Sequence, residues 1–354
     1  MNAVQSFKLS GIAIPHSAAE MLDEICEHFV EHAEVERSND LAILRSKSGL
    51  ATVQADNGKL LIELECPTSE SLQAARTDIA EHLFYFAGDQ PLELKWTEPV
   101  SLPILPNLHE VTVVSAEDVT PRMRRVRFSC ADVTPFVGGD MHVRLLVPPR
   151  GKTPVWPGFR EDGRIAWPEG DDELLVRVYT IRMVDLERKE LWIDFLQHPT
   201  PGISTPGADF ARDAQTGDKA ALLGPGGGSL PLAPSMLLIG DESALPAIAR
   251  IAAEAPAGTY MRAIIEVEDP AEEQSFPATD SLEVRWLHRS HYPDRADRIL
   301  LAEGQNAITS IDQNTFVWAA CEKEDIRVIR SALKERRHDR KNMYVAWYWE
   351  RNLG

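Results

Sequence analysis

The sequence has few cysteines, no long apolar run and no recognisable leader. Its four cysteines (Cys26, Cys66, Cys130 and Cys321) are scattered and form no C-x-x-C pair. We therefore expect no metal centre, iron–sulfur cluster or disulfide framework. No apolar run approaches the ~20 residues of a membrane-spanning helix, and the N-terminus has no basic region followed by an apolar stretch. These absences favour a soluble protein of the reducing cytoplasm.

Positive charge is scarce as well. The chain has 37 Lys and Arg against 55 Asp and Glu residues, a formal net charge of -18 over 354 residues. Such a surface repels nucleic acid and anionic membranes, so we expect neither partner and no membrane insertion. We expect a monomer or a weak homodimer. A few arginines in a cleft can still form a local basic pocket.

The length predicts two or three domains. Residues 1–99 are predicted to form a small α+β domain of order α-β-β-β-α, and a Pro-rich linker follows. The expected elements are helices at 18–32 and 69–86 and strands at 41–45, 50–54 and 60–65, with a hairpin turn at Asn57-Gly58. His28, His32 and His82 allow a metal site, but surface or capping roles are favoured because no carboxylate partner has a recognised spacing.

Residues 108–234 are predicted to form an antiparallel β-barrel, because short strands follow one another without a long helix. The expected strands are 111–115, 124–129, 142–147, 177–182 and 190–198. A segment rich in Pro and Gly, 148–168, is predicted to be a long loop. The glycines of Gly224-Pro-Gly-Gly-Gly-Ser229 fit a tight interdomain turn and a cofactor contact about equally.

Residues 235–354 alternate strands and helices, which predicts a parallel sheet covered on both faces. The expected strands are 235–240, 261–267, 281–287, 316–320 and 343–347, and the expected helices are 244–255, 294–303 and 324–337. No G-x-G-x-x-G follows the first strand, so the usual dinucleotide fingerprint is absent. Ligands of such sheets bind beyond the carboxyl ends of the strands, where Gly240-Asp-Glu-Ser243 and Ala320-Cys-Glu322 are expected.

The most distinctive stretch is Arg177-Val-Tyr179-Thr180-Ile-Arg182. Strand alternation puts Arg177 and Tyr179 on one face, and Thr180 and Arg182 on the other. An edge strand protected by charged residues has a similar composition. Guanidinium groups that bind phosphate and a ring that stacks on a flat cofactor favour a dinucleotide site instead.

Four stretches together resemble the motifs of one family. They are R-x-Y-T-x-R, Gly224-Pro-Gly-Gly, Gly240-Asp-Glu-Ser-Ala-Leu-Pro-Ala-Ile248 and Val317-Trp-Ala-Ala-Cys-Glu322. The sequence from residue 108 onward resembles the siderophore-interacting proteins, FAD-dependent ferric-siderophore reductases of the ferredoxin–NADP reductase superfamily. The first 99 residues, with His82-Leu-Phe-Tyr-Phe-Ala87, resemble a small domain of unassigned role that precedes some of these reductases.

The resemblance implies an FAD site on the barrel. Arg177 would bind the phosphates or the ribityl chain, and Tyr179 would stack on the flavin ring. Thr180 would lie near the reactive N5 edge, and Arg182 would meet the diphosphate or the polar edge of the flavin. The resemblance implies a second FAD segment at His198, Gly202, Ser204 and Thr205.

The resemblance also implies an NADH or NADPH site at the carboxyl edge of the sheet. The residues expected there, facing the flavin or the nicotinamide, are Asp241, Glu242, Ser243, Cys321, Glu322 and Trp349. The residues predicted to be catalytic are Tyr179, Thr180, Asp241 and Glu242.

Three positions depart from the family pattern. Ser243 replaces a usual Thr and keeps the hydroxyl, and Arg144 replaces a Lys and keeps the charge with a different geometry. Cys321 replaces a usual Gly and adds a side chain where nicotinamide would approach, so it either narrows that access or is tolerated. No second cysteine is identifiable as its redox partner.

The implied substrate is a ferric siderophore, which requires a pocket for a large and often anionic chelate. Arg144 and Arg351 are the candidates for its positive wall, with Arg250 as a third, and each is equally well an ordinary surface arginine. The acidic residues Glu266, Glu268 and Asp269 follow the second parallel strand and favour NADH, because they would repel a 2′-phosphate.

Two alternatives to a siderophore reductase remain. A general flavin or ferredoxin-type reductase with a protein acceptor belongs to the same class, although the acidic surface disfavours an acidic ferredoxin. A flavoprotein that binds siderophore without turnover belongs to another class and depends on Cys321 blocking the nicotinamide.

Overall fold

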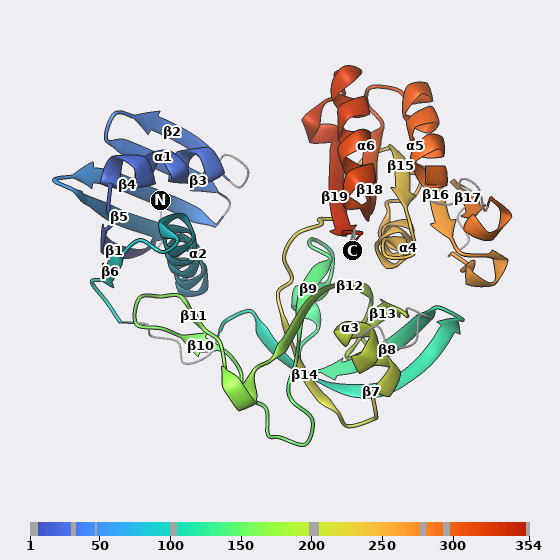
Figure 1. Cartoon of the computed structure of the whole chain (residues 1–354), viewed down its shortest axis with the longest axis horizontal. Helices are drawn as coiled ribbons and strands as arrows, with labels where there is room; N and C mark the ends of the chain where they lie inside the picture. The colour runs from blue at the N-terminus through green and yellow to red at the C-terminus, as the bar shows by residue number, and fades with distance from the viewer. Residues whose placement is uncertain are drawn as a thin grey trace, which may run out of the picture. The chain divides into compact units, whose positions relative to one another are not determined.

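The computed structural model describes residues 6–29, 33–46, 48–99, 105–197, 205–276, 281–292 and 298–351. The chain divides into two compact units (Figure 1). Unit 1 comprises Met1–Pro106 and Val155–Glu173, and unit 2 comprises Asn107–Pro154 and Leu174–Gly354. Each unit is described by itself.

Unit 1 contains a six-stranded antiparallel sheet of order β2-β3-β4-β5-β1-β6 and two helices. The strands are β1 (Phe7–Ile14), β2 (Glu34–Ser38), β3 (Leu41–Ser46), β4 (Gly49–Asp56), β5 (Lys59–Cys66) and β6 (Glu93–Trp96). The helices are α1 (Ala18–Phe29) and α2 (Ser69–Ala87). Apolar residues of both helices and of one sheet face share one core, in which Leu22, Ile62 and Leu83 are fully buried.

The predicted helices and the three predicted strands of unit 1 are confirmed, as is the turn, where Asn57 and Gly58 both have positive φ. The structure adds β1, β2 and β6. Strands β2 and β6 lie at the two sheet edges, where short polar strands give little alternation signal. In β1, Gly11 interrupts the alternation of apolar and polar residues. Glycine is needed there because a Cβ would lie 2.6 Å from the Trp96 ring.

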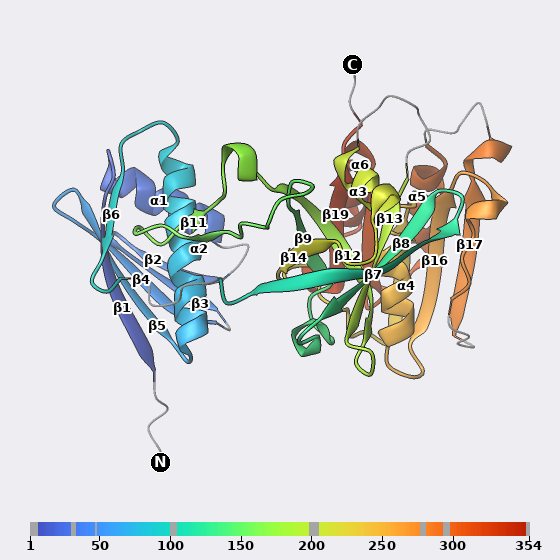
Figure 2. The ribbon, with the colours of Figure 1, turned by 90° about the horizontal axis from the view of Figure 1, so that it is seen from below.

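The segment predicted to be a long loop contains a short hairpin. Its strands are β10 (Gly158–Phe159) and β11 (Ile165–Ala166), and the 3-10 turn η2 (Gly170–Asp172) follows. Figure 2 shows this hairpin beside α2, and residues 155–173 belong to unit 1 rather than to the barrel that precedes and follows them in sequence.

Unit 2 begins with a closed antiparallel barrel of order β12-β13-β8-β7-β14-β9. Its strands are β7 (Leu108–Thr120), β8 (Met123–Cys130), β9 (His142–Val147), β12 (Leu175–Asp185), β13 (Glu190–Leu196) and β14 (Lys219–Leu223), with the turn η1 (Thr134–Phe136) and the helix α3 (Pro206–Asp213). Alternate residues fill the interior, where Val126, Phe128 and Ile193 are fully buried. The predicted barrel is confirmed.

The second part of unit 2 is a parallel sheet of order β17-β16-β15-β18-β19. Its strands are β15 (Ser235–Gly240), β16 (Tyr260–Val267), β17 (Leu282–His288), β18 (Phe316–Glu322) and β19 (Met343–Trp349). Its helices are α4 (Leu245–Glu254), α5 (Ile299–Ser310) and α6 (Lys323–Glu335), and its 3-10 turns are η3 (Pro270–Glu272), η4 (Arg289–His291) and η6 (Arg340–Asn342).

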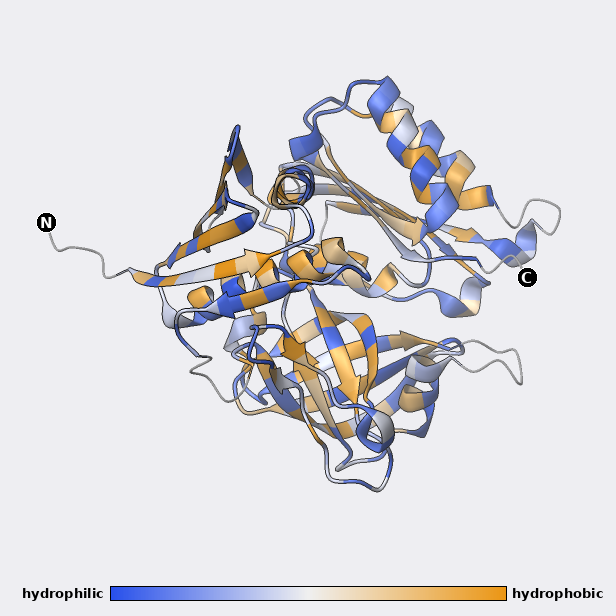
Figure 3. Cartoon of the chain, turned by 60° about the vertical axis from the view of Figure 1, so that its left-hand side comes forward, coloured by the Kyte–Doolittle hydropathy of each residue, from blue (hydrophilic) through white to orange (hydrophobic). Residues whose placement is uncertain are grey.

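The helices cover both faces of this sheet, as predicted. One core lies between the sheet and α4, and a second lies between the sheet and the pair α5 and α6. Strand β15 is apolar throughout because both of its faces are buried. Apolar and polar stripes alternate along the helices (Figure 3). Among the described residues, no helix combines the length and the apolar character needed to cross a membrane.

Candidate functional site

Strand β12 presents two different faces, as the alternation predicts. Tyr179 pairs with Val143 and Arg177 with Leu145, and both partners belong to the barrel core. Arg177 and Tyr179 therefore lie on the inward side, with Arg177 exposed at the end of the strand. The outward side carries Val178, Thr180 and Arg182, opposite His142 and Arg144 of β9.

Tyr179 forms a flat apolar surface on the inward side. Its ring lies 4.3 Å from the ring of Phe195, centroid to centroid. Gly207 of α3 makes room for it, because a Cβ there would overlap the phenol oxygen. Burial raises the pKa of Tyr179 to about 12, although Arg177 opposes this. The phenol stays neutral at physiological pH, which suits a stacking platform better than a proton donor.

Two arginines at this end of the β9–β12 ladder have no carboxylate partner within the described residues. Arg177 donates to the carbonyl oxygen of its neighbour Val176 at 2.8 Å. Arg144 is exposed on β9 and pairs in register with Val178. Most other arginines of this acidic chain are in ion pairs, so these two are available for an anionic ligand.

The outward side of the ladder is joined to β19 through His142. The imidazole Nδ1 donates to the Gly227 oxygen at 3.0 Å, and Nε2 accepts from the Tyr348 hydroxyl at 2.6 Å. Burial lowers the pKa of His142, with the Gly227 oxygen and Asp140 opposing. Thr180 lies next to Tyr348, and its hydroxyl hydrogen bond partly offsets the rise that burial causes in the pKa of Tyr348.

The glycine stretch makes this arrangement possible. Gly228 has φ +64, and a Cβ there would lie 2.0 Å from the imidazole of His142. The Gly227 oxygen also accepts from the backbone N–H groups of Met141 and His142. The structure shows these glycines packed closely around a histidine, a role that neither of the two predictions named. No motif in the sequence links positions 142, 228 and 348, which lie far apart along the chain.

At the carboxyl edge of the parallel sheet, Asp241 is buried and connects two predicted residues. It accepts from the backbone N–H of Ser243 at 2.9 Å, from the Ser243 hydroxyl, and from Trp349 Nε1 at 2.7 Å. Burial raises the pKa of Asp241 against these hydrogen bonds. Trp349 remains 40% exposed, so the site keeps an aromatic face toward solvent.

Glu242 belongs to an ion-pair cluster that the sequence did not indicate. Arg289 of η4 binds both carboxylate oxygens of Glu242 and one oxygen of Glu266. Glu268 bonds to Arg289 and, at 2.9 Å, to Arg122. Burial by itself would lower the pKa of Arg289. The hydrogen bonds to Glu242 and Glu266 outweigh burial and raise that pKa. Residues from three strand ends meet here, which only the sheet order brings together.

Cys321 corrects the expectation of a side chain in the path of nicotinamide. The residue is 1% exposed and packs in the core beneath α5 and α6. Burial raises the pKa of its thiol. Glu322 caps α6 by accepting from the N–H groups of Glu324 and Asp325, and it accepts from the Arg351 N–H at 3.2 Å. Burial by itself would raise the pKa of Glu322. These hydrogen bonds outweigh burial and lower that pKa.

Arg250 is a second correction. It is 1% exposed and donates to the carbonyl oxygens of Ile181 and Phe136 at 3.0 and 2.7 Å and to Glu254 at 2.8 Å. A buried guanidinium with these partners ties α4 to the barrel and does not line an open pocket. Arg351 remains a candidate, since its guanidinium lies at the surface 5.9 Å from the centroid of the Trp349 ring.

The remaining predicted residues fall into three cases. Arg182 faces away from Arg177, and its buried Nε has no hydrogen-bond partner within the described residues. Thr205 precedes α3, with its N–H bonded to Asp209. The predictions for His198, Gly202 and Ser204 lie outside the described residues.

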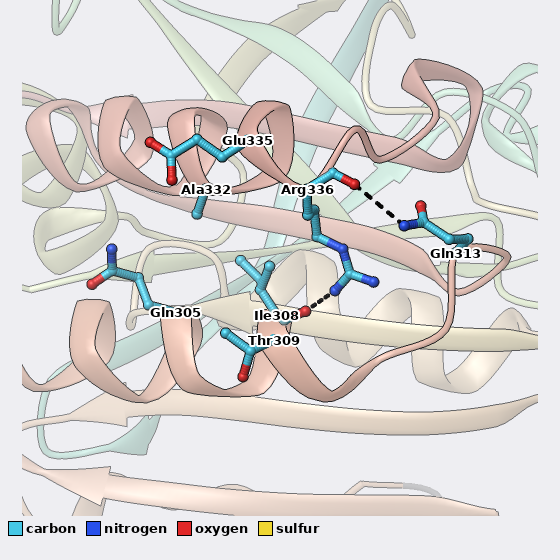
Figure 4. A pocket seen from close by; sticks show the side chains of 7 residues that line it. All are labelled: Gln305, Ile308, Thr309, Gln313, Ala332, Glu335 and Arg336. Carbon is cyan, nitrogen blue, oxygen red and sulfur yellow. Dashed lines mark hydrogen bonds between the residues drawn. The ribbon is translucent and has the colours of Figure 1, made fainter.

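A groove of about 500 Å³ lies away from these residues, between α5 and α6 (Figure 4). Its lining includes Gln305, Thr309 and Glu335, and Arg336 closes one end by bonding to the carbonyl oxygens of Ile308 and Ile311. None of the predicted site residues lines it. Within the described ranges, no three His, Cys, Asp or Glu side chains are grouped to hold a metal.

Comparison with known proteins finds three family matches along the chain. Residues 112–229 match the siderophore-interacting FAD-binding domain, and residues 233–352 match the siderophore-interacting protein family. Ferric vibriobactin reductase ViuB of Vibrio cholerae is 30% identical over 66% of this chain and 86% of its own length. The chain belongs to the siderophore-interacting protein family. Residues 12–97 match a domain conserved in bacteria and described as uncharacterized (DUF2218).

Solved structures support the same family. The siderophore-interacting protein SipS from Aeromonas hydrophila is 25% identical, with a TM-score of 0.56 over 70% of this chain and 93% of its own. A siderophore utilization protein from T. fusca is 31% identical, with a TM-score of 0.55 over 73% and 98%. This siderophore-interacting protein thus shares with them the part of the chain outside the uncharacterized domain.

The barrel of this siderophore-interacting protein fits FAD. A diphosphate needs cationic donors without carboxylate partners, and Arg177 supplies one. A flavin ring needs a neutral aromatic platform, and Tyr179 supplies it. On the other face, the buried Nε–H of Arg182 donates to no acceptor among the described residues.

Proposed function

We propose that this chain is an FAD-dependent ferric-siderophore reductase that takes its electrons from NADH. The observation that carries the proposal is the pair of arginines, Arg144 and Arg177, at one end of the β9–β12 ladder. Neither has a carboxylate partner in the part of the chain that the structure describes. They lie in a chain whose relatives include two named ferric-siderophore reductases, for vibriobactin and for acinetobactin.

The protein contributes binding and orientation. Arg177 would hold the FAD phosphates, Tyr179 would support the ring and Thr180 would lie near its reactive edge. When bound, FAD supplies the exchange of a two-electron hydride from NADH for the single electrons that Fe(III) accepts. Arg144 and Arg351 attract the anionic chelate. Iron is released because the hard oxygen donors of siderophores prefer Fe(III) to Fe(II).

The preference for NADH rests on the charge beyond β16. Arg289 is a basic residue at that edge, but Glu242, Glu266 and Glu268 already surround it. A phosphate would have to displace these carboxylates, whereas the ribose hydroxyls of NADH can donate to them. Binding NADPH therefore costs more.

Anaerobic mixing tests the proposal in two steps. The purified protein with FAD is first mixed with NADH or NADPH, and loss of the oxidised flavin absorbance is recorded. Ferric siderophores of a panel are then added, and return of that absorbance is recorded. We expect bleaching with a lower KM for NADH, followed by reoxidation with at least one siderophore.

The two steps separate the alternatives. Absence of bleaching with either nucleotide rules out a pyridine-nucleotide reductase. Bleaching without reoxidation by any ferric siderophore assigns another acceptor. The non-catalytic alternative loses its support, because it depended on Cys321 standing in the path of nicotinamide and that side chain is buried in the helix-covered core.

A further inference from the structure

The connection between β9 and β12 leaves the barrel and returns to the same place. Val147 at the end of β9 pairs with Leu175 at the start of β12, so residues 148–174 form an excursion from one end of the ladder. The middle of this excursion, Val155–Glu173, belongs to unit 1. A connection of this length without support of its own is uncommon in a compact domain.

Side chains of α2 and β6 bind the backbone of this excursion at three successive carbonyl groups. The bonds run from Arg76 Nη2 to the Glu161 oxygen at 3.2 Å, from Trp96 Nε1 to the Asp162 oxygen at 2.7 Å, and from Thr77 Oγ1 to the Gly163 oxygen at 2.9 Å. Side-chain donors matched to consecutive backbone acceptors are what a peptide-binding surface provides.

Two further contacts fix the hairpin. The backbone N–H of Ile165 donates to Glu81 at 2.8 Å. The Arg164 guanidinium lies 3.4 Å from the centroid of the Phe84 ring, which is a cation–π contact. Asp162 holds Arg164 in that orientation through two side-chain bonds of 3.0 and 2.7 Å.

The surface is shaped for one backbone conformation. Gly163 has φ +94, and a Cβ there would lie 3.0 to 3.1 Å from Arg76 and Trp96. Arg76 itself is 2% exposed, with its guanidinium 5.4 Å from the Trp96 ring centroid. A buried arginine at a contact between helix and hairpin is costly unless the contact persists.

We propose that the domain of residues 1–99 is an internal receptor for the hairpin 155–173, and that through this grip it orders the flavin end of the β9–β12 ladder. The three contacted carbonyls, the glycine and the buried arginine carry the first part. The second part rests on the proposed FAD site: Arg144 lies three residues before the ladder's last pair, and Arg177 lies two residues after it.

The anchored hairpin is connected to β12, the strand of the proposed FAD site, through the covalent chain. The excursion joins β12 at Leu174, which is buried, and Arg177 follows within the exposed end of the strand. Anchoring the middle of a long connection lowers the number of conformations open to both of its ends. The ladder end is then preorganised for its ligand.

The first test cleaves the chain between the units. A protease site is inserted between Pro99 and Leu105 of the full chain, the protein is cut, and the fragments are separated by size exclusion. We expect the two fragments to elute together. The double variant Thr77→Val, Trp96→Phe removes two of the donors. Valine matches threonine in size, and phenylalanine keeps an aromatic ring that is smaller than indole. We expect its fragments to bind at least about tenfold more weakly.

The matched control is Arg160→Ala. Arg160 lies on the same hairpin, and its side chain makes a long 3.8 Å ion pair with Glu169 of the same segment. This variant should behave as the wild type. Separation of the wild-type fragments, or equal affinity in the double variant and the control, overturns the receptor role.

The second test reads the ladder end in the uncut protein. Amide hydrogen exchange of residues 144–147 and 175–178, without FAD, should be faster in the double variant than in Arg160→Ala. The Kd for FAD, from flavin fluorescence, should rise about fivefold or more. Equal exchange in both variants overturns the ordering. A wild-type protein that binds no FAD removes the proposed function instead, while the exchange and cleavage results still decide the grip.

Discussion

Arg177 is a cation at the mouth of the barrel whose side chain bonds only to a neighbouring carbonyl within the described residues. Tyr179, two residues on, offers a ring that remains neutral. Their roles separate by chemistry: the guanidinium contributes charge-assisted hydrogen bonds, and the phenol contributes area and shape. Substitutions should therefore affect FAD binding in different ways.

We expect Arg177→Gln to weaken FAD binding by about tenfold or more, because a charge-assisted bond to phosphate is worth ~1.5–3 kcal/mol. Isothermal titration of the apoprotein with FAD measures the change. Arg188→Gln, an exposed arginine of the β12–β13 turn paired with Asp185, is the matched control. Equal affinities for the two variants would contradict the phosphate role.

His142 predicts a pH dependence of stability. Burial lowers its pKa in the folded state, whereas a histidine of the unfolded chain titrates near ~6.5. As the pH falls below that value the unfolded state gains a proton that the folded state resists. The stabilisation is therefore complete above about pH 6.5 and is lost as the pH falls toward the folded pKa.

Urea unfolding between about pH 8 and about pH 5 tests this expectation. In His142→Gln, the free energy of unfolding should decline less steeply toward acid pH than it does in the wild type. The flattening should be partial, because burial also lowers the pKa of His109. His291→Gln, at an exposed position, should leave the wild-type slope. A slope unchanged in His142→Gln assigns the decline to other groups.

At the scale of elements, α4 and β12 are joined by one buried arginine. Arg250 donates to the Ile181 oxygen on β12 and to the Phe136 oxygen on η1. These bonds hold the first helix of the parallel domain against the strand that carries Arg177 and Tyr179. Arg250 therefore contributes to the relation of the two predicted ligand sites, beside the apolar packing of Met123 and Met141 in the same core as α4.

We expect Arg250→Met to lower the free energy of unfolding of unit 2 by about 2–4 kcal/mol, because it leaves two buried carbonyls without a donor. Denaturant titration of the full chain followed by tryptophan fluorescence provides the measurement. Arg262→Met, on β16 and partly exposed, controls for loss of an arginine. If the free energy of unfolding fell by less in Arg250→Met than in the control, packing alone would join α4 and β12.

The end of β16 should set the choice of nucleotide. Glu268 is a partly exposed member of the carboxylates around Arg289. Replacing it with Lys changes the local charge by two units and removes one of the three carboxylates that bind Arg289. We expect Glu268→Lys to lower the KM for NADPH relative to NADH by about tenfold. Steady-state kinetics with both nucleotides measures this change. Glu283→Lys on β17 is the control, and an equal change in the control would mean that the effect is not local to the end of β16.

At the scale of the whole molecule, the net charge of -18 opposes the approach of an anionic chelate. Local arginines attract it only within about one Debye length, ~8–10 Å at moderate salt. We expect the association rate of an anionic ferric siderophore to rise with ionic strength, while that of a neutral one stays constant. Stopped-flow measurement of the association rate at low and at physiological salt tests this expectation. A rate that falls as salt rises would mean that the arginines attract the chelate at long range.

Much of the architecture was predictable because periodicity and turn residues are local signals. Five of the six barrel strands and the strands of the parallel sheet followed from alternation and from apolar runs, but β14 was not predicted. Edge strands such as β2 did not, since Val35 is the one apolar residue of β2 and a single residue shows no alternation. The hairpin at 155–173 was predicted as loop because its order comes from Arg76 and Trp96, far away in sequence.

The site was partly predictable for the same reason. The residues of one strand, Arg177 to Arg182, could be assigned to faces from alternation alone. Contacts such as His142 with Tyr348 and Glu242 with Arg289 join distant segments, and one sequence contains no signal for them. Cys321 and Arg250 were misjudged because sequence position at a strand end or on a helix does not reveal which core a side chain enters.

The hairpin that sits in unit 1 also imposes an order on synthesis. Residues 1–99 leave the ribosome roughly 55 residues before the hairpin, an interval of several seconds at about 5–20 residues per second. During that time Arg76, Trp96 and the face of α2 have no backbone to bind. The first domain thus emerges with a vacant binding surface, and the nascent barrel is completed only after its own middle segment has been captured by the part made first.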